Sequence, residues 1–127
     1  MSLSIAVVGA SPDRRKFGNK CVRAYLASGY DVYPVHPSEP IVEGLTAYPT
    51  IADVPVDRFD RVSVYLPPPV ALKVLSSFTA KPIGEVWFNP GADTPEVLHA
   101  AKALGLTVVA ACSIVDIGRS PREFPDE

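Results

Sequence analysis

The segment Leu3–Lys20 reads LSIAVVGASPDRRKFGNK, an apolar run that ends in a glycine and is followed by a group of basic residues. The run Leu3–Gly9 is typical of a short, buried parallel strand. Apolar or small residues then recur with helical spacing at Phe17, Cys21, Ala24, Tyr25 and Ser28. Gly29 supplies a stop for that helix. The segment therefore predicts a strand that turns directly into a helix.

The rest of the chain repeats this alternation. Four further runs predict strands, at Tyr30–Val35, Arg61–Leu66, Gly84–Asn89 and Leu106–Ala111. Two helical stripes separate the later strands, namely Ala71, Val74, Leu75 and Phe78, and Val97, Ala100, Ala101 and Leu104. Prolines between His36 and Phe59 prevent a long helix there, so we expect at most a short strand near Leu45–Tyr48 and one helical turn near Ile51. The pattern predicts an α/β fold, a single Rossmann-like doubly wound domain with a five-stranded, mainly parallel sheet and helices on both faces.

Size and composition limit the number of domains, the class of partner and the cellular compartment. The 127 residues, 47% of them hydrophobic, predict one domain at 1–118 and a polar tail at 119–127 that is loosely held. A net charge of -2 argues against nucleic-acid or membrane partners. Two cysteines make neither a disulfide framework nor a metal site. With no secretory start and no membrane span, we expect a cytoplasmic protein with reduced thiols.

The first turn concentrates positive charge. Five of the twelve basic residues lie between Arg14 and Arg23. In an open parallel sheet, ligands bind beyond the carboxyl ends of the strands, and this turn lies there. Gly9 allows close backbone approach, Ser11 offers a hydroxyl, and the N-terminus of the following helix attracts anions. The turn therefore predicts a site for a pyrophosphate or for several phosphates.

The spacing in this turn is not that of a dinucleotide fingerprint. Glycines would be needed at positions 11 and 14, which hold Ser11 and Arg14. The acid that would bind a ribose hydroxyl at the end of the second strand is also missing, because Asp31 stands at the beginning of that strand. These departures disfavour NAD. They weaken NADP without excluding it.

Candidates for catalysis are few. His36 lies at the mouth of the expected groove, but no neighbouring sequence supplies an acid or a nucleophile, so a ligand contact is the better interpretation. Cys21 belongs to the buried face of the first helix, and Cys112 follows the last strand, where packing is favoured over contact with a bound thiol. We therefore predict no catalytic residue and no metal ligand.

With these residues in view, the sequence resembles the small stand-alone CoA-binding proteins. Their single Rossmann-like domain is similar to the N-terminal CoA-binding domain of the succinyl-CoA synthetase alpha subunit. The resemblance covers about Ile5 to Asp116 and rests on VVGAS with its basic helix start, GYDVYPVHP, YPTIADVP, YLPPP, VWFNPGA and GLTVVAACSI, in that order. Many relatives have Asn at the position of His36, and many have Gln after the Trp that corresponds to Trp87.

The resemblance implies coenzyme A as the ligand and assigns a role to each part of the site. The CoA phosphates would be bound by Gly9, Ala10, Ser11, Arg14, Arg15, Lys16, Phe17 and Gly18. The nucleotide would be flanked by Val35, His36 and Pro37, and the groove bordered by Leu66, Pro67 and Pro68. The pantetheine arm would pass Asn89 and Gly91. Ligase activity does not carry over, because the synthetase's phosphohistidine-bearing domain and partner subunit have no counterpart here.

Three hypotheses follow from the sequence. The first is a non-catalytic module that binds CoA or an acyl-CoA. The second is a small enzyme that depends on NADP or acyl-CoA and uses His36 or Cys112. The third is a scaffold module without a ligand. A homodimer or a protein partner stays open under each of them.

Overall fold

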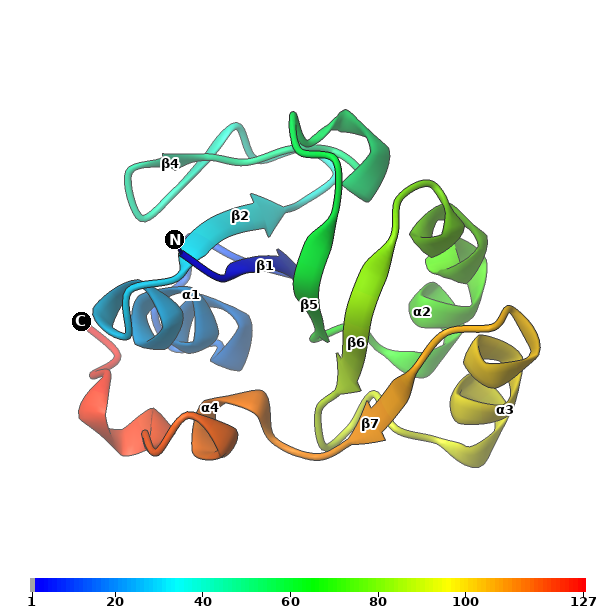
Figure 1. The fold of residues 1–127 in the computed structure, drawn as a ribbon. Coiled ribbons are helices and arrows are strands. Elements are labelled where there is room, and N and C mark those ends of the chain that lie inside the picture. Colours follow the sequence, from blue (N-terminus) through cyan, green and yellow to red (C-terminus); the bar gives the residue numbers. More distant parts are fainter. Residues whose placement is uncertain (1) are drawn as a thin grey trace.

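The computed structural model describes residues 2–127, which form one twisted sheet between two layers of helices (Figure 1). The sheet contains β1 (Ser4–Val8), β2 (Asp31–Val35), β5 (Phe59–Val64), β6 (Ile83–Phe88) and β7 (Val108–Ala110). Their order is β2-β1-β5-β6-β7, and every pair is parallel. The predicted five-stranded Rossmann-like α/β fold is confirmed.

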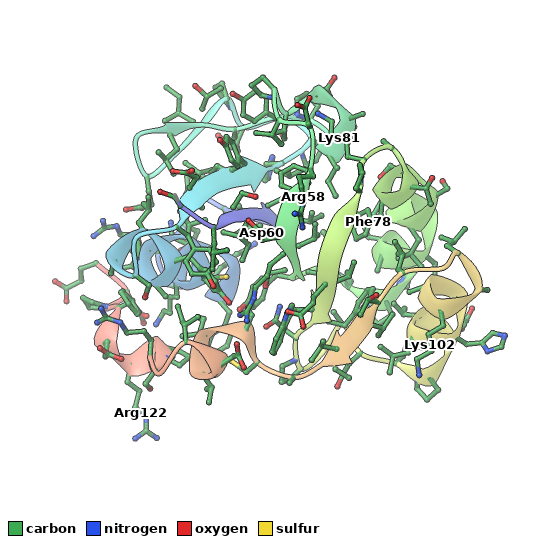
Figure 2. The ribbon with its side chains drawn as sticks, viewed as in Figure 1. Arg58, Asp60, Phe78, Lys81, Lys102 and Arg122 are labelled. Carbon is green, nitrogen blue, oxygen red and sulfur yellow. The ribbon has the colours of Figure 1, made fainter. Side chains whose placement is uncertain are left out.

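The helices divide between the two faces of the sheet. α1 (Phe17–Ala27) and the short α4 (Ser113–Asp116) belong to one buried cluster, whereas α2 (Pro68–Val74), α3 (Pro95–Ala103) and the 3-10 helices η1 (Ile51–Asp53) and η2 (Leu75–Thr79) belong to the other. Successive side chains of β1 point to opposite faces of the sheet. Ile5 and Val7 therefore pack in the cluster that contains α1, and Ala6 and Val8 pack in the cluster that contains α2. From η2, Phe78 lies between β6 and the neighbouring helical segments (Figure 2).

The proline-rich connection contains more structure than the sequence predicted. The expected strand near Leu45–Tyr48 is β4 (Leu45–Thr46), and the expected turn at Ile51 is η1. β4 pairs antiparallel with β3 (Ile41–Val42), which the sequence analysis missed. The turn between them is Glu43–Gly44, and Glu43 has a positive φ of 49°. A two-residue strand gives too short a pattern to recognise in sequence.

The tail was expected to be loosely held, and this prediction is wrong. The tail contains η3 (Pro121–Glu123), and it runs along α1. Lys20 Nζ lies 2.7 Å from Asp126 Oδ1, and Arg23 donates to the carbonyl of Pro125 at 2.9 Å. Phe124 packs against the α1 core cluster beneath the Arg23 guanidinium. Lys20 and Arg23 of α1, together with the ring of Phe124, therefore hold the tail against α1, although its composition is mostly polar.

Asn89 joins three elements from inside the protein. Its side chain is 1% exposed. Nδ2 donates to Ser63 Oγ at 2.8 Å and to the Val64 carbonyl at 3.0 Å, both in β5. Oδ1 accepts from the Ser113 amide at 2.9 Å and from its hydroxyl at 3.1 Å. The end of β6 is thus tied to β5 on one side and to the start of α4 on the other.

Replacing Asn89 by Ala should lower the free energy of unfolding by about 2–4 kcal/mol, because the buried Ser113 amide loses its partner. Urea denaturation of both proteins measures this difference. Ser76→Ala, an exposed change on η2, serves as the control and should stay within about 0.5 kcal/mol of wild type. Equal midpoints for the Asn89 variant and the control would contradict the role of this side chain.

Candidate functional site

A cleft of about 540 Å³ lies at the carboxyl ends of the strands. Its walls come from the β1–α1 turn, the end of β2, the end of β5 and the β6–α3 turn. Eleven of the sequence-predicted residues line it: Gly9, Ala10, Ser11, Lys16, Phe17, Gly18, His36, Pro37, Leu66, Pro67 and Gly91. The fold therefore gathers segments that are far apart in the sequence at the edge where doubly wound domains bind ligands.

A second pocket of about 230 Å³ opens beside this cleft. The two share Gly9, Pro37 and Leu66. Most of the remaining wall of the smaller pocket is apolar, with Val35 from β2, Ile51 from η1, Val70 and Val74 from α2, and Phe78 from η2. The larger cleft thus continues into an apolar recess that suits a flat ring or an aliphatic group.

Two glycines let backbone segments come very close together at the end of β1. Gly9 has a φ of 91°, and a Cβ on it would overlap the carbonyl oxygen of Tyr65. A Cβ on Gly18 would in turn overlap the carbonyl oxygen of Gly9. No side chain caps the N-terminus of α1, and its first turn holds no acidic residue. The first N–H groups of α1 therefore keep their partial positive charge at the cleft, where Phe17 and Gly18 form part of the wall.

The basic residues near this turn have separate tasks. Lys16 lines the cleft. Arg15 instead pairs with Asp13 at 2.9 Å, and this contact lowers the pKa of the Asp13 carboxyl to about 2. Lys20 and Arg23 hold the tail, as described above. Across residues 2–127, Lys16 is the one lysine or arginine on the wall of either pocket. Lys102 on α3 and Arg122 on η3, for example, point outward from the protein (Figure 2).

Arg14 is held by the β3–β4 turn. Its guanidinium donates to both carboxylate oxygens of Glu43, at 2.6 and 3.1 Å. Glu43 also accepts from Asn19 at 3.0 Å, and Asn19 in turn donates to the Ser11 carbonyl at 2.8 Å. Hydrogen bonding to Arg14 holds the pKa of the Glu43 carboxyl below its ordinary value. Arg14 and Glu43 therefore brace the loop from outside the cleft.

His36 has a fixed orientation at the end of β2. Its Nδ1 accepts from the backbone amides of Ser38 at 3.1 Å and Glu39 at 2.9 Å. An imidazole nitrogen that accepts two N–H groups carries no hydrogen, so the ring proton lies on Nε2. His36, on the wall of the cleft, thus carries its ring N–H at Nε2.

Some predicted residues do not reach the cleft. Arg14 and Arg15 bind carboxylates outside it, and Val35 lines only the smaller pocket. Pro68 begins α2 beyond both pockets, and Asn89 is buried below the cleft with its amide fully engaged. The wall also contains Tyr65, Pro90 and Ala92, which were not among the predicted site residues. Each lies inside a strand-end motif quoted above, YLPPP or VWFNPGA, and that position was the available signal.

Neither cysteine lines the cleft or the smaller pocket beside it. Cys21 is fully buried beside the Ser63 and Ser113 hydroxyls, and burial raises the pKa of its thiol to about 11. Cys112 is half-buried and precedes α4. No group of three metal-binding side chains occurs within residues 2–127, and no helix in that range is long and apolar enough to cross a membrane.

The chain has a match to a known protein family over most of its length. The sequence model described as the CoA binding domain covers residues 3–118. The chain belongs to this CoA-binding domain family. A conserved hypothetical protein from Pyrococcus furiosus is 31% identical, with a TM-score of 0.80 over 90% of this chain and 98% of that one. A Thermus thermophilus structure is 32% identical, with a TM-score of 0.77 over 91% and 87% of the two chains.

Another member of this structural group is part of a larger enzyme. A dinucleotide-forming acetyl-coenzyme A synthetase from Ca. Korarchaeum cryptofilum, solved with phosphate and ADP, is 28% identical with a TM-score of 0.73. The match covers 85% of this chain and 25% of the synthetase. This CoA-binding domain therefore corresponds to about a quarter of that synthetase.

The two thiols should differ in reactivity. We expect a thiol reagent such as DTNB to label Cys112 in the native protein and Cys21 only after unfolding, because Cys21 is buried and stays protonated. Counting released thiolate with and without urea measures this difference, and Cys112→Ser is the control that removes the native signal. Labelling of two thiols at the same rate in the native protein would contradict it.

The ion pair between Glu43 and Arg14 should make stability depend on acid pH. The pKa of Glu43 is lowered from 4.5 in the folded state, so its contribution is complete above pH 4.5 and is lost as pH falls through the folded value. Glu43→Gln should therefore have a lower urea midpoint than wild type at neutral pH. The two midpoints should converge as the pH falls below 4.5, and a gap that stays constant as the pH is lowered would contradict the assignment.

Proposed function

We propose that this protein binds coenzyme A or an acyl-CoA in the cleft, as a non-catalytic binding or regulatory module of the cytoplasm. The observation that carries the proposal is the uncapped N-terminus of α1 beside Lys16, in a chain of the CoA-binding domain family. A pyrophosphate combines the negative charge and the acceptor oxygens that free amides and an ammonium group bind.

The shape of the site supports a ligand with three parts. The pyrophosphate would lie against Gly9–Ser11 and the start of α1. The adenine ring would enter the apolar recess beside Val35, which has few polar groups to compete for it. The pantetheine arm would leave along Gly91 in the β6–α3 turn. Pro37 and Leu66 belong to both pockets and would separate the ring from the phosphates.

Calorimetric titration with CoA, acetyl-CoA, NADP and ATP on one preparation tests the ligand. We expect CoA or acetyl-CoA to bind more tightly than NADP, since the turn lacks the dinucleotide glycines. Heat from NADP alone would favour the enzyme hypothesis over this one. No heat and no thermal shift with any of the four would favour a scaffold without a ligand.

Lys16→Ala should raise the Kd for CoA about tenfold, because a charge-assisted phosphate contact is lost. Arg15→Ala is the matched control. Arg15 is the adjacent basic residue but pairs with Asp13 outside the cleft, so its removal should change the Kd little. Titration of both variants at two salt concentrations provides a second measurement, with a reduced salt dependence expected for Lys16→Ala. Equal effects of the two changes would mean that the basic loop acts only through its general charge.

A further inference from the structure

In the turn after β2, the side chain of His36 accepts hydrogen bonds from backbone amides of the same turn. His36 Nδ1 accepts the N–H groups of both Ser38 and Glu39, at 3.1 and 2.9 Å. Successive amides at a strand end are a common binding site for a phosphate group. Here the imidazole occupies the two donors, so an anion at this turn would have to displace it.

This turn is also where a doubly wound domain contacts the ribose of a nucleotide. In dinucleotide-binding relatives of the fold, the end of the second strand carries an acid for a ribose hydroxyl or an arginine for a ribose phosphate. The position of His36 on the cleft wall, next to the recess that Val35 lines, agrees with this arrangement. A phosphate on the ribose would therefore lie near His36 and the turn after it.

The charges around this turn do not favour a phosphate. Within residues 2–127, the only lysine or arginine on either pocket wall is Lys16, which belongs to the β1–α1 turn. Glu39 adds a negative charge three residues after His36. The other basic residues of the first turn already bind Glu43, Asp13 or the tail. Lys16 and the N-terminus of α1 together provide enough positive charge for one pyrophosphate, and no further cation of the described residues is left on the pocket walls for a second phosphate group.

We propose that the site recognises the adenosine pyrophosphate of its ligand but not the phosphate on the ribose, and that His36 keeps the second-strand turn closed to that phosphate. The inference rests on the proposed function. It predicts that the preferred class of ligand includes 3′-dephospho-CoA as well as CoA. His36 is then a specificity-determining residue, and its Nε2–H remains available for a neutral oxygen of the ligand.

The test compares CoA with 3′-dephospho-CoA by calorimetry on three proteins: wild type, His36→Ala and His36→Asn. For wild type, the two Kd values should agree within about threefold, because no charge-assisted contact to the ribose phosphate exists. His36→Ala frees the two amides, so CoA should become favoured by more than about threefold. His36→Asn is the matched control. The oxygen of an asparagine side chain can accept amides a short distance along the chain, so the wild-type ratio should persist.

The ratio of the two Kd values separates this inference from the proposed function. A wild-type preference for CoA above about threefold would overturn the inference and leave CoA binding intact. If His36→Ala leaves the ratio of the two Kd values at its wild-type value, His36 does not determine this specificity. If neither ligand binds wild type, the proposed function fails and the inference fails with it. Because general loss of affinity in a variant cancels in the ratio, partial damage to the site does not imitate the expected result.

Discussion

The contact between the start of α1 and the end of β1 determines the geometry of the cleft. Gly18 lies against the backbone of Gly9, and Gly9 lies against the backbone of Tyr65, with no room for a Cβ at either contact. Three backbone segments therefore meet where other parts of the fold are separated by side chains. This contact brings the amides of α1 to the cleft and aligns the ends of β1 and β5. A larger residue at Gly18 would push α1 away from the end of β1, and one at Gly9 would push the β1–α1 turn away from the segment that follows β5.

The charged residues near that contact act in two groups. Lys16 faces the cleft, whereas Arg14 bridges the loop to Glu43 and Lys20 and Arg23 bind the tail. The hairpin β3–β4 and the tail thus neutralise most of the charge that the sequence concentrates in this turn. A local charge excess in a sequence is for this reason a poor measure of the charge that a ligand meets.

Local patterns were enough to predict the sheet, the helices on its two faces and the edge that carries the cleft. The continuous apolar run Ile5–Val8 is visible in the sequence, as is the glycine after β1. The position of Arg14 was not predictable in this way, because Glu43 is 29 residues away and its turn has no pattern of its own. Asn89 is similar. The tripeptide Asn-Pro-Gly reads as an exposed turn, yet its first side chain points inward to Ser113, 24 residues later.

β7 has a consequence for the behaviour of this domain in a crowded solution. It is the last strand of the sheet and is three residues long. At the opposite edge, β2 is followed by the β3–β4 hairpin, and Val35 forms a bridge with Tyr48. Unpaired strand edges are the places where separate chains join into larger sheets. By keeping one edge short and covering part of the other, the fold leaves little backbone on which a neighbouring molecule could begin to aggregate.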